Sequence, residues 1–314
     1  MEDRAEPEGR GATVPRDPEP GGHPLRLHLV DGTYELFRAH HAPGPTRTDP
    51  AGRDVKATVG VVSTLLRLLH DDDEAVTHLA VAFDHPITSW RNRELASYKD
   101  GADTDPALLA QFDRVEDAVA ALGVTVWPQD EYEADDVLAS AALRYAPDVD
   151  EVRILTPDKD LAQVVGDRVV QVDRARGRVL DAEAVRERMG VAPESVPDLL
   201  ALTGDAADGI PGIPGFGAKT AATLLARYPH LEDIPADPAE WDVTVRGAAR
   251  LGERLQAERD RALAYRRLTR LVTDLELPDD VEVLRFDGVP RERYLAWCDE
   301  VGVNQLRDRP RRWA

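Results

Sequence analysis

The chain has 314 residues and a formal net charge of −20, a charge that argues against indiscriminate binding to nucleic acid. Apolar residues make up 42% of the sequence, which is enough for one large domain or two ordinary ones. No apolar run approaches the roughly 18 residues of a membrane span, and the single cysteine, Cys298, excludes an internal disulfide or a cysteine-based zinc site. These features favour the cytoplasm and no membrane association.

The N-terminal stretch is rich in proline, glycine and charge. It lacks the apolar segment of a secretory signal. We expect a disordered tail over residues 1–24.

From residue 25, short apolar runs that end in aspartate alternate with segments of helical length. The runs span 25–32, 77–84 and 151–160, and the helical segments span 55–70, 107–123 and 133–146. This alternation indicates an α/β fold, a parallel sheet with helices on both faces. Ligands of such sheets bind beyond the carboxyl ends of the strands. A lone aspartate there is ordinarily a loop or cap residue, but three at one edge, Asp31, Asp84 and Asp158, point to a site.

The strand pattern fades after about residue 190. Residues 191–229 are predicted to be helical around a Gly/Pro turn, and the rest is mostly helical, with a possible short strand at 281–286. We therefore expect a catalytic domain over 25–190 and a helical region over 191–314.

Residues 131–136 read EYEADD and place four carboxylates in six residues. Glu133 and Asp136 share a helix face, with Asp135 on its flank. Like charges this close repel, so the stretch is either an acidic helix start that favours the dipole or a metal site. Hard divalent cations such as Mg²⁺ and Mn²⁺ take oxygen ligands, and the absence of interleaved histidine disfavours zinc. Two ions about 3.5–4 Å apart would clamp an in-line displacement at phosphorus. The candidate ligands are Asp31, Asp84, Glu133, Asp135, Asp136, Asp158, Asp160, Asp205 and Asp208.

A glycine-rich turn follows in GDAADGIPGIPGFGAKTA, residues 204–221. Such a turn between helices can aim backbone N–H groups at a nucleic-acid phosphate, and Lys219, followed by Thr220, could contact a phosphate. It is not a P-loop, because Ala218 separates the last glycine from Lys219 and no strand precedes it. A purely structural hairpin is the alternative. The glycines concerned are Gly212, Gly215 and Gly217.

Two further segments are rich in basic residues. In 88–103, cations alternate with Trp90 and Tyr98, the residue types that grip a single strand, although a solvated amphipathic helix explains the pattern about as well. Residues 246–270 contain eight arginines against three acids. That segment fits a solvated helix with i,i+4 pairs as well as a basic contact surface.

Taken together, these motifs resemble the bacterial 5′→3′ exonuclease and flap endonuclease family, which includes the N-terminal nuclease domain of DNA polymerase I. The resemblance covers about residues 25–306, and its order and spacing are specific. The motifs are VDG (30–32), VAFD (81–84), YK (98–99), YEADD (132–136), TPDKD (156–160), residues 204–221 and VTDLELP (272–278).

The resemblance implies a PIN-like α/β nuclease domain followed by a helix-three-turn-helix, a variant of the helix-hairpin-helix. It implies two or more Mg²⁺ or Mn²⁺ ions, the first held by Asp31, Asp84 and Glu133. Asp158, Asp160, Asp205 and Asp208 would serve the second region, with Asp135 and Asp136 between. Arg91 and Lys99 match the basic residues of the family's helical arch, which steer the scissile phosphate, and Tyr98 matches a base-stacking position. The glycine hairpin with Lys219 matches the element that grips duplex DNA and in relatives also holds K⁺ through backbone carbonyls.

Some positions depart from the family pattern. Ala102 stands at the position where the family usually has a second basic residue after the YK motif. Gly209 stands where the family usually has an asparagine after the last aspartate. We expect a stand-alone, monomeric enzyme of DNA replication and repair that acts on 5′ ends, flaps or nicks, with a polymerase and a ligase as possible partners. The alternatives are a PIN-type RNase and a DNA-structure-binding protein with weak or no cleavage.

Overall fold

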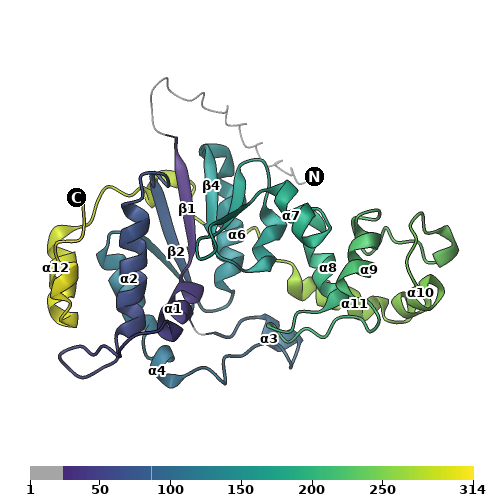
Figure 1. Cartoon of the computed structure of the whole chain (residues 1–314), viewed down its shortest axis with the longest axis horizontal. Helices are drawn as coiled ribbons and strands as arrows, with labels where there is room; N and C mark the ends of the chain where they lie inside the picture. Colours follow the sequence, from purple (N-terminus) through teal and green to yellow (C-terminus); the bar gives the residue numbers. More distant parts are fainter. Residues whose placement is uncertain (1–23, 86) are drawn as a thin grey trace, which may run out of the picture.

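The computed structural model describes residues 24–85 and 87–314, so nearly all of the predicted tail over 1–24 lies outside the described residues. Its centre is a six-stranded sheet with the order β3-β2-β1-β4-β5-β6 (Figure 1). Strands β1 to β5 are parallel and β6 is antiparallel to β5. The strands are β1 (Arg26–Asp31), β2 (His78–Asp84), β3 (Thr125–Gln129), β4 (Glu151–Leu155), β5 (Val169–Asp173) and β6 (Arg178–Leu180).

Helices cover both faces of the sheet and continue into a helical end of the molecule (Figure 1), which confirms the expected architecture. The helices are α1 (Gly32–His41), α2 (Lys56–Leu69), α3 (Arg91–Glu94), α4 (Pro106–Leu109), α5 (Phe112–Ala121), α6 (Ala134–Tyr145), α7 (Ala182–Met189), α8 (Val196–Thr203), α9 (Ala218–Leu225), α10 (Ala248–Ala257), α11 (Arg259–Thr269) and α12 (Arg291–Val301).

The strands feed two apolar cores, one on each face of the sheet. Leu27 and Leu29 of β1 lie in the core that contains α6, whereas Val81 and Phe83 of β2 lie in the core that contains α2 and α5. Successive side chains of a strand point to opposite faces. Strands buried on both faces therefore read as continuous apolar runs, which is what made β1 and β2 recognisable.

A third core holds the helical end together. It contains apolar residues of α7, α8, α9 and α10 (Figure 1). Helix α11 packs along α8 and brings Ala262 into this core.

The last part of the chain returns to the sheet. Leu271 and Leu284 belong to the core that contains α6, and Trp297 of α12 joins the core that contains α2. Figure 1 places α12 and α10 at opposite ends of the molecule. The predicted region 191–314 is therefore not one spatial unit, and the domain division near residue 190 stays a proposal.

Two local predictions need correction. The helix expected over 107–123 is interrupted near Gln111, whose side-chain oxygen accepts hydrogen bonds from the backbone N–H and hydroxyl of Thr58 at 3.1 and 3.2 Å. The strand expected over 281–286 is wrong: Val281–Leu284 form a 3₁₀ turn. The Asp280 side chain starts this turn by accepting from the Glu282 N–H at 2.9 Å.

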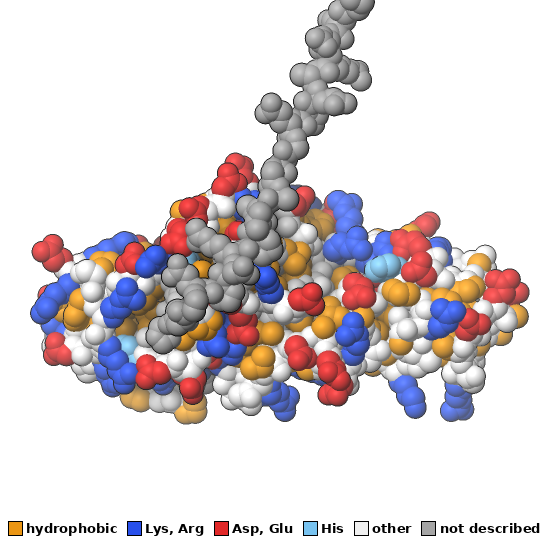
Figure 2. Space-filling model, turned by 90° about the horizontal axis from the view of Figure 1, so that it is seen from above, with side chains coloured by type: hydrophobic (Ala, Val, Ile, Leu, Met, Phe, Trp, Pro, Cys, Tyr) orange, Lys and Arg blue, Asp and Glu red, His pale blue; other side chains and the backbone are white. Residues whose placement is uncertain are grey.

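No described helix combines the length and apolar character that crossing a membrane requires. On the face seen in Figure 2, acidic and basic side chains are interspersed wherever the grey residues leave the surface visible. The net charge of −20 is therefore not gathered into one large acidic patch on that visible face.

Candidate metal centre

Two strand ends place aspartates at one edge of the sheet. Asp31 ends β1, and its two carboxylate oxygens accept hydrogen bonds from the Tyr34 N–H at 2.8 Å and the Thr156 hydroxyl at 2.9 Å. Asp84 ends β2 and accepts from the Ala134 N–H, the first residue of α6, at 2.7 Å. These bonds fix both carboxylates at the carboxyl edge of the sheet.

The start of α6 brings further carboxylates to the same edge. Glu133 is the N-cap of α6, and its side chain and that of Asp136 cap each other's backbone N–H groups. Asp135 lies in the first turn, where Asp158 and Asp31 act on it electrostatically. The EYEADD stretch is thus both a helix start and part of the acidic edge.

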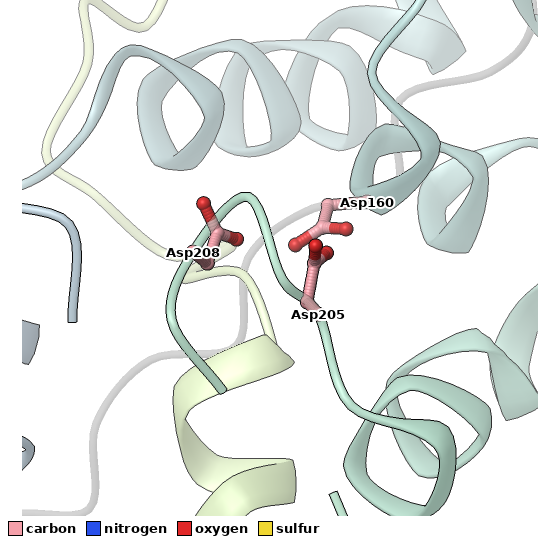
Figure 3. Close-up of side chains that lie close together, drawn as sticks. All are labelled: Asp160, Asp205 and Asp208. Atoms are coloured by element: carbon pink, nitrogen blue, oxygen red, sulfur yellow. The ribbon is translucent and has the colours of Figure 1, made fainter. Parts of the chain in front are cut away.

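Three aspartates converge most tightly. The ligand oxygens of Asp160, Asp205 and Asp208 all lie within 4.8 Å of one another, and the carboxylates point toward one another (Figure 3). Asp160 follows β4, whereas the other two lie in a turn after α8 that is closed by paired 2.8 Å backbone hydrogen bonds between Asp205 and Ile210. Three of the four residues predicted for the second metal region therefore come together. Among the described residues, the predicted first trio, Asp31, Asp84 and Glu133, does not converge to this degree.

Burial and mutual repulsion raise the pKa values of these carboxyl groups and so disfavour their charged forms. Burial raises the pKa of Asp31 to about 7, helped by the charges of Asp84 and Asp158. Burial, followed by the charge of Asp158, raises the pKa values of Asp135 and Asp160 well above the ordinary range. Proximity of like charges acts in this direction generally.

The donor set fits a hard divalent cation. All the converging ligand atoms are carboxylate oxygens, the type that Mg²⁺ and Mn²⁺ prefer. Moreover, Oδ1 of Asp160 is buried and has no hydrogen-bond partner among the described residues. A buried acceptor without a partner is costly, and a cation at this position would satisfy it.

Two lysines supply positive charge at the acidic edge. The Lys99 ammonium lies 3.0 Å from Asp208 and 3.4 Å from Glu133, and the Lys159 ammonium lies 2.7 Å from Asp205. Burial alone would raise the pKa of Glu133, but Lys99, followed by Arg91, outweighs it and lowers that pKa. Sequence reasoning assigned no role to Lys159, although its place between two candidate ligands was a usable signal.

Arg91, predicted to steer the phosphate, and Asp136, predicted to bind metal, form a buried ion pair with each other. Arg91 is 1% exposed and Asp136 is 0% exposed. The guanidinium donates to both Asp136 oxygens at 2.7 Å and to the backbone carbonyl of Leu268 at 2.8 Å. In this structure Asp136 and Arg91 are thus paired with each other, and either would have to leave this pair to bind a metal ion or a phosphate; their predicted roles stay proposals.

Residues 95–100, which we call the strap, pass over the tight aspartate group. The Ser97 hydroxyl donates to the Gly209 carbonyl at 2.9 Å, and the Lys99 N–H donates to the Asp208 carbonyl at 3.2 Å. Tyr98 is 5% exposed, with its hydroxyl 3.2 Å from Glu133. It is therefore not presented as a base-stacking surface in this conformation.

Gly209 permits this close docking. Its φ of +74° is one that L side chains rarely adopt, and a Cβ there would lie 1.8 Å from the Ser97 carbonyl oxygen. The strap therefore passes too close to residue 209 for any side chain, including the asparagine that the family usually has at this position.

The glycine hairpin lies between α8 and α9. At Gly212, with a φ of +72°, a Cβ would lie 2.4 Å from the backbone nitrogen of Gly204, so the two chain segments cross too closely for a side chain. Gly215 also has a positive φ, whereas Gly217 is the N-cap of α9 and makes no side-chain cap. Lys219 is exposed and Thr220 half-buried in the first turn of α9. All the predicted DNA-contact residues except Tyr98 thus lie in this hairpin and the first turn of α9, where Gly215, Gly217 and Lys219 are exposed and Gly212 is buried.

Comparison with known families agrees over most of the chain. Residues 26–190 match the family described as "5'-3' exonuclease, N-terminal resolvase-like domain", and residues 191–292 match "5'-3' exonuclease, C-terminal SAM fold". DNA polymerase I of Bacillus subtilis is 32% identical over 289 residues, which are 90% of this chain and 32% of that protein. DNA polymerase I of Mycobacterium leprae is 35% identical over 289 residues, 90% of this chain and 31% of that protein. The chain therefore spans about a third of the length of these relatives.

Solved structures share the fold at lower identity. Zinc-bound T5 5′-exonuclease superposes with a TM-score of 0.64 at 19% identity, covering 79% of this chain and 90% of that one. The catalytic core of Rad2 in complex with DNA substrate gives a TM-score of 0.58 at 14% identity, covering 88% of each chain.

The raised carboxyl pKa values predict that cations stabilise the protein more at higher pH. A carboxyl group whose pKa is higher in the folded than in the unfolded state makes stability decline as pH rises between the two values. For Asp31 this interval runs from about 4 to about 7. We expect the gain in melting temperature on adding Mn²⁺, relative to EDTA, to be small at pH 5 and to grow toward pH 8.

The pH profile has an internal control. In EDTA at pH 8, Asp160→Asn should melt at a higher temperature than the wild type, because one repelling charge is removed, and it should gain less from Mn²⁺. A gain from Mn²⁺ that is the same at pH 5 and pH 8 would contradict this account of the acidic edge.

The buried ion pair predicts that substituting Arg91 lowers the free energy of unfolding much more than substituting its neighbour Arg93. Arg91→Met should lower the free energy of unfolding by about 3–5 kcal/mol, because it leaves the Asp136 carboxylate buried and unpaired. Arg93→Met removes a side chain that is 64% exposed and should change stability by no more than about 1 kcal/mol. Chemical denaturation measures both, and equal losses would mean that the Arg91–Asp136 pair is not the link described here.

The docked strap predicts that Gly209→Ala is costly. The variant places a Cβ against the Ser97 carbonyl and strains the backbone, so we expect a loss of about 1–3 kcal/mol and faster hydrogen exchange at the Lys99 amide. Gly166→Ala is the matched control, because nothing lies within 4 Å of a Cβ there. If both variants show the wild-type exchange rate at Lys99, the strap is not held by this contact.

Proposed function

Because the chain belongs to the 5′–3′ exonuclease family, we propose that it hydrolyses phosphodiester bonds of DNA at 5′ ends, nicks or flaps. The observation that carries this proposal is the acidic edge, where Asp160, Asp205 and Asp208 approach within 4.8 Å of one another. Mg²⁺ or Mn²⁺ suits this donor set. When two such ions are bound, they stabilise charge on the phosphate and help to activate the attacking water.

The chain's own residues divide the work. We assign Asp160, Asp205 and Asp208 to one cation and Asp31, Asp84 and Glu133 to another. Asp135 and Asp158 lie electrostatically close to both groups. Lys99 contacts Glu133 and Asp208; cations held by these carboxylates would take the place of its ammonium, which would then be available to pair with the phosphate.

The hairpin between α8 and α9 is the proposed duplex contact. Within the part of the chain that the structure describes, no side chain caps the first N–H groups of α9, and free N–H groups at a helix start favour an anion. Lys219 is exposed beside them, so it and Thr220 would contact the DNA backbone. The backbone carbonyls of the turn are the proposed K⁺ ligands.

The biological setting follows from the relatives. The sequence relatives are named DNA polymerase I, and this chain matches about a third of their length. We propose that it works as a monomer in DNA replication and repair, where a polymerase and a ligase would act on the same ends.

A second candidate is a DNA-structure-binding protein with weak cleavage. It is favoured by the docked strap, because Lys99 lies on two candidate ligands and must move before cations can take its place. An RNA-directed activity would use the same carboxylates, and matched DNA and RNA substrates separate the two.

Cleavage assays on 5′-flap, nicked and single-stranded substrates test the proposal. With saturating Mn²⁺, Asp158→Asn should lower the cleavage rate by at least the 10- to 100-fold that is typical even of residues that orient metal ligands. Its affinity for duplex should stay within about threefold of the wild type, because the side chain faces cations and not phosphate.

Asp181→Asn is the matched control. It removes one exposed carboxylate, the N-cap of α7, which is not among the candidate ligands, and should cleave at the wild-type rate. A wild-type rate in Asp158→Asn, or binding without cleavage by the wild type, would favour the second candidate.

A further inference from the structure

A cavity of about 670 Å³ lies between the segment around α3 and the C-terminal end of α11. Its walls come from residues 90–94, 131–132 and 263–274. The proposed cleavage reaction uses none of the side chains that line it. The wall of the cavity includes the C-terminal part of the arginine-rich segment 246–270. The sequence alone assigned this segment no definite role.

The cavity is basic in a strongly acidic protein. Three acidic residues, Glu94, Glu131 and Asp274, also line it, so the wall has a net charge of +1 whereas the chain has −20. A locally positive cavity in such a protein concentrates anions. The four basic residues of the wall are Arg93, Arg266, Arg267 and Arg270.

Several of these arginines are available to a ligand. Arg270 is exposed, and its guanidinium makes no ion pair within 24–85 or 87–314. The side chains of Arg93 and Arg267 are 64% and 66% exposed, paired with Glu131 and Glu94 respectively. Exposed pairs of this kind contribute little, so a phosphate can take the place of either carboxylate.

Aromatic rings complete the wall. Trp90 and Tyr132 line the cavity and are half-buried. The guanidinium groups of Arg267 and Arg91 lie 5.6 and 4.7 Å from the Trp90 ring centroid, so a base would reach this ring by displacing the exposed Arg267, whereas Tyr132 has no such contact among the described residues. Arginines combined with aromatic rings are the combination that binds unpaired nucleotides through phosphate and base.

The cavity shares a wall with the acidic edge. Ser89 donates a 2.8 Å hydrogen bond to Glu133, and the backbone N–H of Trp90 donates to the Glu131 carbonyl at 2.9 Å. The two short segments that hold Glu133 therefore present their neighbouring residues, Trp90 and Tyr132, to the cavity. Tyr132 of the cavity wall is the chain neighbour of Glu133 at the acidic edge, so a strand whose reacting phosphate lies at the acidic edge would pass beside the cavity.

We propose that this cavity binds an unpaired 5′ nucleotide of the DNA substrate, with the base against Tyr132 or Trp90 and a phosphate on Arg270. The inference rests on the proposed function and specifies its substrate: a duplex with an unpaired 5′ extension. Because the strap is docked on the tight aspartate group, the cavity gives such an extension a place outside the strap.

The test compares two substrates in EDTA, where no cleavage occurs: a nicked duplex with a four-nucleotide unpaired 5′ extension, and the same duplex without it. Fluorescence anisotropy gives the ratio of the two dissociation constants. Arg270→Gln should reduce the preference for the extended substrate about five- to tenfold and flatten its log–log salt slope by about 0.7, the value for one single-strand phosphate. Tyr132→Leu should reduce the same preference by roughly fivefold or more through lost stacking.

Arg250→Gln is the matched control, because it removes the same charge from the same basic segment at an exposed position of α10 outside the cavity. It should leave the ratio unchanged. If Arg270→Gln and Tyr132→Leu both keep the wild-type ratio, or if Arg250→Gln lowers it equally, the cavity assignment is overturned. Cleavage of the nicked duplex by the wild type, measured separately with Mn²⁺, reports on the proposed function and can fail or succeed independently.

Discussion

Repulsion among carboxylates crowded at one sheet edge is the constraint on which the rest of the structure depends. The nine candidate ligands lie at this edge or in the turn beside it, with Asp136 paired to Arg91, and burial together with neighbouring charge raises the pKa of several of them. The chain's own lysines offset part of this negative charge. Lys99 lies on Glu133 and Asp208, and Lys159 lies on Asp205. Cations would replace these contacts, which couples metal binding to the position of the strap.

The same edge joins the sheet to the helical end of the molecule. Arg91 pairs with Asp136 of α6 and donates to the backbone carbonyl of Leu268 in α11. Asp136 in turn accepts from the Val272 N–H at 2.9 Å. One buried ion pair therefore fastens the sheet, the segment after β2 and the helical end together. Removing either partner alone leaves a buried charge, so this pair helps to fix the position of the acidic edge.

The sequence predicted the carboxylate edge because aspartates at strand ends are a local signal that topology then gathers. It also predicted the glycine hairpin, because Gly212 stands where only glycine fits. It did not predict that Asp136 belongs to Arg91, since the partners are 45 residues apart and a carboxylate in EYEADD looks the same whether it faces a cation or a guanidinium. Nor could the pattern of apolar and polar residues reveal the 3₁₀ turn at Val281–Leu284. There the Asp280 side chain caps the turn and sets the local structure. The cavity beside α11 likewise depends on three segments that meet only in the folded chain.

The central claim is that the carboxylates at this edge are a cation site whose negative charge Lys99 and Lys159 partly offset. Diffraction from crystals grown with Mn²⁺ near pH 8, using the anomalous signal of the ion, tests it most directly. The account predicts a peak within about 2.0–2.6 Å of oxygens of Asp160, Asp205 and Asp208, with the Lys99 ammonium displaced from its 3.0 Å contact with Asp208. The absence of any peak at this edge under saturating Mn²⁺, with Lys99 still in contact with Asp208, would contradict it.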